Sequence, residues 1–352
     1  MKRIVIADIK SNNNHGVCTG HYYALASNYR DVFGDCCDVK VAGGPIYLKR
    51  FKQEDLIMLP HDYINGDSKI RNFIRICLNA RKLFKQVNKD DVVIIQQSQP
   101  AMILFALLLT YWGKSNVYQI QYSEEPMRRP LFRLMMKFAQ FRIKGLICPN
   151  DIVGKAYGIP YIVVPDYIYI EKNFSMPDNR FSSKKYDYAI VGRIAAGKGV
   201  SEAVRAMAGK KCSLVVAGSP QDVSEEKTIK KYSSECTNIE TKLEYISENE
   251  YDYYIRESRY CLLNYQGDYA ERSSGVVLDT IFRGIPVVGR RCRALQFVED
   301  NNLGVLYDDI WSFDFSRLLD ERVYNDFVTS IALYRRDVAA NQGKLIKFVL
   351  GS

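Results

Sequence analysis

Short apolar runs with the character of buried strands alternate with helical patterns along this chain. In the first half the strand-like runs are Lys2–Ile9, Asp38–Ala42, Asp91–Gln96, Asn116–Tyr122 and Gly145–Pro149. Helical patterns such as Ile70–Val87 separate them. This alternation predicts a parallel sheet with helices on both faces, because parallel strands need a crossover connection long enough to hold a helix.

The second half repeats the alternation. Its strand-like runs are Tyr186–Val191, Cys212–Gly218, Ile239–Ile246, Arg259–Tyr265 and Ile285–Gly289. A length of 352 residues allows two substantial cores. We therefore expect an α/β protein with two Rossmann-like parallel-sheet domains at residues 1–170 and 186–330. A polar linker at residues 171–185 and a helical tail at 331–352 complete the predicted organisation.

The positive charge lies in the first half. Residues 1–170 contain 23 Lys plus Arg and 14 Asp plus Glu, whereas the remaining residues contain 26 of each kind. A basic domain beside a neutral one suggests an anionic partner, such as a membrane surface or a phosphorylated acceptor. Ordinary solvated surface charge is the alternative.

Several classes of protein are disfavoured. The longest apolar run, Ala101–Trp112, is shorter than the roughly 20 residues that span a bilayer, so we expect a buried helix there. The first residues read as a strand and not as a signal peptide, so we expect a cytoplasmic protein. The nine cysteines include no Cys-x-x-Cys, and no dinucleotide-binding or P-loop glycine motif is present.

Met127–Lys144 carries apolar residues at helical spacing, namely Leu131, Leu134, Met135, Phe138 and Phe141, with basic residues largely elsewhere on the helical wheel. Two interpretations are open. A basic amphipathic helix can lie in a membrane interface. Alternatively, the apolar stripe packs in the core of the domain and the basic face meets water.

Loops at the carboxyl ends of strands hold further candidates, because open parallel sheets bind ligands along that edge. In the first half these candidates are Gly20 and His21 at the start of a helix, Gln97 after one strand and Glu124 after another. Each of them could equally be a turn, capping or surface residue.

Asp268–Gly289 reads D-Y-A-E-R-S-S-G-V-V-L-D-T-I-F-R-G-I-P-V-V-G. A polar loop brings Ser273, Ser274 and Gly275 to the start of an apolar helix, where unpartnered N–H groups and the helix dipole favour an anion. Glu271 precedes that helix, and Asp279 follows eight residues later, roughly 12 Å along a helix axis. This separation suits carboxylates that accept hydrogen bonds from hydroxyls on either side of a diphosphate. A capped core helix without a ligand is the alternative for this stretch alone.

Gly192–Gly199, G-R-I-A-A-G-K-G, follows the first strand of the second half. Arg193 and Lys198 are separated by five positions within this loop. A guanidinium can hold two phosphate oxygens at once, and an ammonium adds a mobile point charge. The loop is therefore a second candidate for binding phosphate.

These motifs resemble those of GT-B glycosyltransferases, in particular the large retaining family numbered four. Glu271 and Asp279 are similar to its E-x7-E signature, with Asp in place of the second Glu, and Gly192-Arg193 and Lys198-Gly199 match its phosphate-binding loop. The motifs occur in the order of the family over about half of the chain. The resemblance implies a GT-B fold whose last helix crosses back to the first domain.

The resemblance also implies roles. Gly192, Arg193 and Lys198 would meet the diphosphate of a nucleotide sugar, with UDP as the expected nucleotide. Ser273, Ser274 and Gly275 would lie beside it, with Glu271 on the sugar and Asp279 on the ribose. The nucleobase would pack near Tyr245 and Ile246.

The first domain would hold the acceptor near Gly20, His21, Gln97 and Glu124. This acceptor would be a saccharide, and the basic first half suggests one linked to a polyprenyl diphosphate. The implied reaction belongs to bacterial surface polysaccharide synthesis and proceeds with retention. No cofactor, metal or nucleic acid is expected.

Two rival functions fit the same fold. A nucleotide-sugar epimerase would need acid and base groups in the cleft, for which only Glu124 and His21 are candidates. A non-catalytic GT-B subunit would have no need for Arg193, Lys198 and Glu271. Both rivals are disfavoured by the residues present.

Overall fold

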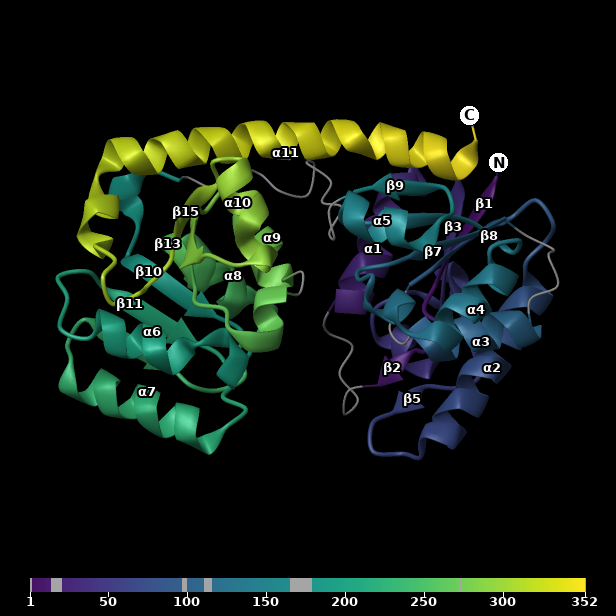
Figure 1. Cartoon of the computed structure of the whole chain (residues 1–352), viewed down its shortest axis with the longest axis horizontal. Coiled ribbons are helices and arrows are strands. Elements are labelled where there is room, and N and C mark those ends of the chain that lie inside the picture. Colours follow the sequence, from purple (N-terminus) through teal and green to yellow (C-terminus); the bar gives the residue numbers. More distant parts are fainter. Residues whose placement is uncertain are drawn as a thin grey trace. The chain divides into compact units, whose positions relative to one another are not determined.

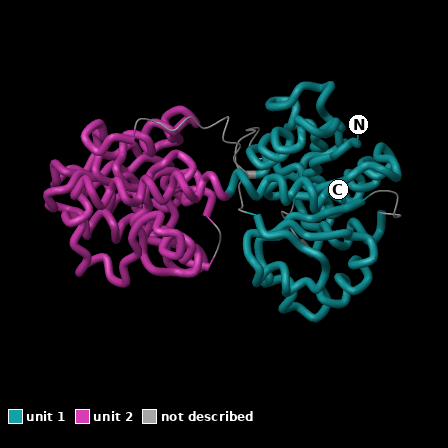
Figure 2. The backbone as a smooth tube through the Cα atoms, turned by 90° about the horizontal axis from the view of Figure 1, so that it is seen from above, with its two compact units in different colours: residues 1–170, 338–352 teal, residues 171–337 magenta. Residues whose placement is uncertain are grey.

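The computed structural model describes residues 2–13, 21–96, 100–110, 116–164, 179–271 and 274–351. The chain divides into two compact units (Figure 2). Unit 1 comprises Met1–Ile170 and Val338–Ser352, and unit 2 comprises Glu171–Asp337. Most of the linker predicted at residues 171–185 lies outside the described residues.

Unit 1 contains a seven-stranded parallel sheet in the order β4-β3-β1-β6-β7-β8-β9. The strands are β1 (Arg3–Ala7), β3 (Asp38–Gly43), β4 (Leu56–Met58), β6 (Val92–Ile95), β7 (Asn116–Ile120), β8 (Ile143–Cys148) and β9 (Tyr161–Val163). Two short strands, β2 (Asn12–Asn13) and β5 (Tyr63–Ile64), pair beside it. The central strands are continuous apolar runs because helices bury both of their faces.

Two apolar cores lie on the two faces of this sheet. One face is covered by α2 (Lys69–Gln86), α3 (Pro100–Thr110), α4 (Pro130–Ala139) and α5 (Asp151–Tyr157). The other is covered by α1 (His21–Gly34) and by the last part of α11 (Glu321–Leu350), through Leu345 and Val349. Figure 1 shows α2, α3 and α4 next to one another.

Unit 2 contains a six-stranded parallel sheet in the order β12-β11-β10-β13-β14-β15. Its strands are β10 (Tyr186–Val191), β11 (Leu214–Ala217), β12 (Ile239–Lys242), β13 (Ser258–Leu263), β14 (Val287–Arg290) and β15 (Gly304–Tyr307). Its helices are α6 (Val200–Met207), α7 (Val223–Glu235), α8 (Glu248–Arg256), α9 (Gly275–Phe282) and α10 (Gln296–Asp300), with the first part of α11. Ser247 and Glu250 form a capping box at the start of α8.

The predicted fold class, two parallel-sheet α/β domains, is confirmed by these two sheets. The boundaries shift by a few residues. The polar loop predicted before α9 includes a 3₁₀ helix, η7 (Gly267–Glu271), and α11 begins at Glu321, before the helical tail predicted at residues 331–352.

The helix predicted over Met127–Lys144 is wrong in its extent, and of its two interpretations the one that packs the predicted apolar stripe in the core is wrong. A 3₁₀ turn, η3 (Glu125–Arg128), precedes α4, and Ile143 already belongs to β8. The buried residues of α4 are Phe132, Met136 and Ala139, whereas the predicted core stripe is exposed at Leu131, Leu134, Phe138 and Phe141. Two faces of this helix are apolar, so its periodicity alone could not identify the face that packs on the sheet.

The helix predicted from the longest apolar run is only partly buried. In α3, Ile103, Leu104, Ala106 and Leu107 belong to the core, while Phe105 and Leu109 are exposed. None of the described helices combines the length and the apolar character needed to cross a membrane.

Candidate functional site

The loops that follow β10 and β13 meet at the carboxyl edge of the unit 2 sheet, where these two strands are neighbours. The backbone N–H of Gln266 donates to the carbonyl of Gly197, with a distance of 2.8 Å. The Tyr269 ring also lies close to Gly197. The Gly192–Gly199 loop and the segment before Glu271, far apart in sequence, are therefore in direct contact.

Glycine backbone conformations shape the first of these loops. Gly192 and Gly199 have positive φ values of 88° and 60°, which side chains disfavour. Between them lie Arg193, whose side chain is exposed, and a 3₁₀ turn, η6 (Ala196–Lys198). The loop is held against the end of β11, where Ile194 N–H donates to Ser219 O at 3.0 Å.

Lys198 is the least compensated cation of the site. The pKa of Lys198 is lowered to about 8, mainly by burial, with a smaller raising effect of Cys261 and a smaller lowering effect of the charge of Arg193. No carboxylate lies within ion-pair distance of Lys198 among the described residues, and its nearest aromatic contact is Tyr269, with 6.0 Å to the ring centroid. A bound anion would supply the missing negative charge.

Polar side chains fix the end of this loop. Asn264, which follows β13, donates to the carbonyl of Gly199 at 3.0 Å and to Glu202 at 2.8 Å. Gln266 also donates to Glu202, and Tyr307 donates to the carbonyl oxygen of the Asn264 side chain at 3.1 Å. Glu202 also lies 3.9 Å from the guanidinium of Arg290. These contacts anchor the loop that carries Lys198 beside β13 and β15.

The helix start predicted at Ser274 and Gly275 is the start of α9. Ser274 is the N-cap residue, and its hydroxyl lies 2.5 Å from the hydroxyl of Tyr265. Gly275 begins the helix, while Ser273 lies outside the described residues. Glu271 ends η7 with an exposed side chain, 3.8 Å from the guanidinium of Arg293. Its carboxylate is accessible for a hydroxyl group of a ligand.

Asp279 lies one turn into α9 and faces α8. Tyr251 donates to Asp279 at 3.2 Å, and the guanidinium of Arg283 lies 3.6 Å from the other carboxylate oxygen. The Tyr251 ring is also next to Gly192, because a Cβ placed on Gly192 would be 3.5 Å from that ring. Tyr251 therefore connects Asp279 to the start of the Gly192–Gly199 loop.

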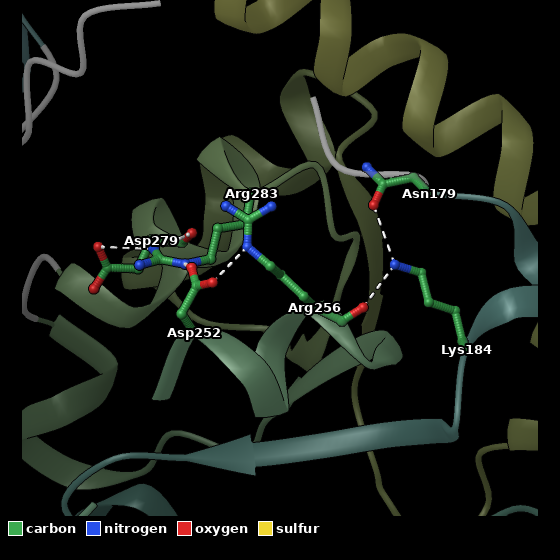
Figure 3. Close-up of polar contacts among 6 residues, drawn as sticks. All are labelled: Asn179, Lys184, Asp252, Arg256, Asp279 and Arg283. Atoms are coloured by element: carbon green, nitrogen blue, oxygen red, sulfur yellow. Dashed lines mark hydrogen bonds and ion pairs between the residues drawn. The ribbon is translucent and has the colours of Figure 1, made fainter. Parts of the chain in front are cut away.

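An ionic network supports this part of α9 (Figure 3). Asp252 accepts from Arg283 at 2.7 Å and from Arg256 at 2.6 Å. The buried Lys184 ammonium donates to the carbonyl of Arg256 at 2.7 Å and to the Asn179 side chain at 3.1 Å. These contacts fix the ends of α8 and α9.

The predicted nucleobase residues are further away along the sheet. Tyr245 and Ile246 follow β12, which is separated from β10 by β11. Tyr245 is 67% exposed, and Ile246 is buried.

Solved glycosyltransferases share this architecture along their whole length. An α,α-trehalose-phosphate synthase (UDP-forming) from Burkholderia xenovorans matches with a TM-score of 0.66 at 10% identity, covering 99% of this chain and 100% of the synthase. HepE from Anabaena, in complex with UDP and glucose, matches with a TM-score of 0.60 at 10% identity, covering 99% of this chain and 100% of HepE. AviGT4, a glycosyltransferase of avilamycin A biosynthesis, matches with a TM-score of 0.62 at 13% identity, covering 100% of this chain and 98% of AviGT4.

This chain has the GT-B fold. The similarity lies in the structure, since no model of a known protein family and no curated protein matches the sequence. The candidate site that contains Gly192, Lys198 and Asp279 lies in unit 2, which holds the second of the two sheets of this GT-B fold.

The candidate acceptor residues of this GT-B chain lie in unit 1. Gly20, Gln97 and the side chain of His21 lie outside the described residues. Glu124 follows β7 and caps η3 at the carboxyl edge of the sheet, with the guanidinium of Arg128 3.6 Å from its carboxylate.

The sequence placed Gln96 among the acceptor candidates at strand ends, but it did not single out the buried amides of Gln119 and Gln121. The side-chain amides of Gln96 and Gln119 and the amide nitrogen of Gln121 are buried and have no hydrogen-bond partner within the described part of the chain. Tyr157 donates to the carbonyl oxygen of the Gln121 side chain at 3.1 Å. Glutamines at the ends of two apolar strands are unusual, so they could have marked this site in the sequence. Their significance becomes clear only when the two strands are known to be neighbours.

In unit 2 the missed residues are Tyr251, Tyr269 and Asn264. They come from α8, η7 and the end of β13, and each contacts the Gly192–Gly199 loop. Nothing in their local sequence marks them, because their importance depends on which strands are neighbours.

Proposed function

We propose that this chain is a glycosyltransferase that moves a sugar from a nucleoside-diphosphate sugar to a saccharide acceptor. The observation that carries the proposal is the partly buried Lys198, which lacks a carboxylate partner among the described residues and shares its loop with the exposed Arg193. A buried cation without a counterion is costly, and a diphosphate would remove that cost. UDP is the proposed nucleotide, because the similar Burkholderia synthase is UDP-forming and HepE binds UDP with glucose.

In this proposal the two cations act mainly in the transition state. As the bond between the sugar and the diphosphate breaks, negative charge grows on the diphosphate, and Arg193 and Lys198 stabilise it more strongly than in the ground state. Glu271 accepts hydrogen bonds from sugar hydroxyls, and Asp279 accepts from the ribose. The two cations replace a metal ion in this role.

The acceptor proposal concerns unit 1. A saccharide linked to a polyprenyl diphosphate would bind near Glu124, and the reaction would serve bacterial surface polysaccharide synthesis with retention of configuration. The leaving phosphate would take the acceptor proton on the reacting face, so no protein base is required. The basic first domain would contact the membrane that holds the acceptor.

The test is calorimetric titration with UDP, GDP and ADP in the presence of EDTA. We expect UDP to bind and the Arg193→Ala variant to bind about 30-fold more weakly, since hydrogen bonds to charged groups contribute about 2 kcal/mol. Lys211→Ala, which removes an exposed cation of the same unit, serves as the matched control and should bind normally. Unchanged UDP affinity in Arg193→Ala, or binding of no nucleotide, would overturn the proposal.

A further inference from the structure

Three neighbouring helices of unit 1 expose large apolar side chains. Their inward residues form one core against the sheet. The exposed residues are Ile70, Ile74 and Leu78 of α2, Phe105 and Leu109 of α3, Leu131, Leu134 and Phe138 of α4, and Phe141 just after α4. Leu131 is 70% exposed and Phe141 is 85% exposed. We call this set, with the basic residues of the same helices, the outer surface of the α2–α3–α4 layer.

These side chains belong to one continuous surface. Figure 1 shows α3 between α2 and α4. The rings of Phe73 in α2 and Phe105 in α3 are 5.5 Å apart, and Arg142, just after α4, donates to the carbonyl of Leu108 in α3 at 2.7 Å. Because the three helices cover the same face of the sheet, their outward side chains point away from that sheet together. An exposed apolar surface of this extent marks an interaction site.

The charge of this surface has one sign. The sequences of α2, α3 and α4 contain no acidic residue, and their basic residues are Lys69, Arg71, Arg75, Arg81, Lys82 and Lys85 of α2 and Arg133 and Lys137 of α4. Arg71 and Arg75 lie 3.7 Å and 2.7 Å from Asp67. A partner that covers this surface must therefore accept apolar side chains and supply negative charge.

The arrangement within α4 fits a lipid interface. With 3.6 residues per turn, Leu131, Leu134 and Phe138 share one face, and Arg133 and Lys137 lie on the adjacent face. The core residues of the helix occupy a third face. Long basic side chains can reach phosphate groups while neighbouring apolar side chains enter the acyl region, which is the pattern of interfacial helices.

We infer that the outer surface of the α2–α3–α4 layer docks this chain on a bilayer that contains anionic phospholipids. The inference rests on the membrane contact named in the proposed function and identifies the surface and the lipid chemistry for it. Glu124 supports the link, because it lies only a few residues before α4 and its ion pair with Arg128 joins it to the basic segment that begins this helix. A lipid-linked acceptor would thus reach the carboxyl edge of the sheet from the docked surface.

The test is sedimentation of the full chain with vesicles of phosphatidylcholine alone or mixed with phosphatidylglycerol. We expect binding only to the mixed vesicles, with affinity that falls as salt rises. Arg133→Gln/Lys137→Gln should bind about 30-fold more weakly, since each basic residue near such a surface contributes about 1 kcal/mol. Leu131→Ser/Leu134→Ser/Phe138→Ser should lose at least tenfold.

Controls separate this inference from the donor-site proposal. Lys227→Gln/Lys231→Gln on the exposed side of α7 removes the same charge from unit 2 and should leave vesicle binding unchanged. All variants should bind UDP like the unaltered chain, which shows that they are folded. If the chain binds vesicles but does not bind UDP, the donor-site proposal is wrong and the inferred docking surface is supported.

Two results would overturn the inference. The first is failure of the unaltered chain to bind phosphatidylglycerol vesicles while it still binds UDP. The second is a triple α4 variant that keeps vesicle binding but changes the oligomeric state in light scattering, which would make this surface a contact between protein chains.

Discussion

Tyr251 donates a hydrogen bond of 3.2 Å to Asp279. The same tyrosine ring lies against Gly192, so one side chain of α8 joins the end of β10 to α9. Burial, followed by the charge of Asp279, raises the pKa of Tyr251 well above its ordinary value. Tyr251 therefore remains a hydrogen-bond donor at any physiological pH, and Asp279 remains the acceptor.

Asp279→Asn should weaken both the fold and ribose recognition. The variant loses the carboxylate that pairs with Tyr251 and Arg283, and we expect its free energy of unfolding in urea to fall by about 1 to 2 kcal/mol. Tyr251→Phe, which removes only the hydroxyl, should cost a similar amount. The unaltered chain should prefer UDP to 2′-deoxy-UDP, and Asp279→Asn should lose that preference. If the preference persists in the variant, the ribose assignment is wrong.

Lys198→Met should stabilise the ligand-free protein. The folded state lowers the pKa of Lys198 from 10.5 to about 8, mainly through burial, so the folded chain binds this proton more weakly than the unfolded chain does. The loss of folding free energy caused by burying the charged ammonium is present in full below pH 8, and it disappears as the pH rises from about 8 to about 10.5. We expect the variant to gain about 1 to 3 kcal/mol in free energy of unfolding at pH 7, a gain that shrinks toward pH 10.5.

Urea denaturation at pH 7 and at pH 10 measures this difference. Lys211→Met, at an exposed position, should show no gain at either pH. A Lys198→Met protein that is less stable than the unaltered chain at pH 7 would show that the ammonium is compensated in the folded state.

The affinity for UDP should depend on the protonation of Lys198. A diphosphate binds the charged ammonium, so affinity should be constant below pH 8 and should fall by up to about tenfold per pH unit above it. Titrations between pH 7.5 and 9.5 avoid the ionisation of the phosphates themselves, which is complete near pH 7. Lys198→Arg keeps its charge throughout this range and should give a flat profile. The same fall in the arginine variant would mean that another group is responsible.

The sequence predicted the two sheets because buried parallel strands are short apolar runs bounded by turn residues, as in Val92–Ile95 and Leu214–Ala217. It also located the Gly192–Gly199 loop, since glycines with positive φ mark the turns on either side of Arg193 and Lys198. The roles of these cations stay predictions.

The packing of α4 and the contacts of Tyr251 could not be predicted. Phe132 and Leu131 are equally apolar and adjacent in sequence, yet one is buried and the other is exposed, because the sheet contacts only one side of the helix. Likewise, Tyr251 reaches Gly192 only because β10, α8 and α9 are brought together by the strand order. Such choices depend on tertiary neighbours and leave no local signal.

Gly218→Ala should distort the Gly192–Gly199 loop, because Gly218 follows the neighbouring strand β11 and lies against Gly192. Gly218 directly follows β11 and has a φ of 152°, and a Cβ there would lie 1.8 Å from the carbonyl oxygen of Gly192. Backbone would have to move, so we expect the free energy of unfolding to fall by about 3 kcal/mol and UDP binding to weaken at least tenfold.

Gly209→Ala is the matched control, because Gly209 also has a positive φ, 70°, but has open space around it. The control should lose about 1 kcal/mol and bind UDP normally. Equal effects of the two substitutions on UDP binding would show that the close approach of Gly218 to Gly192 does not shape the site.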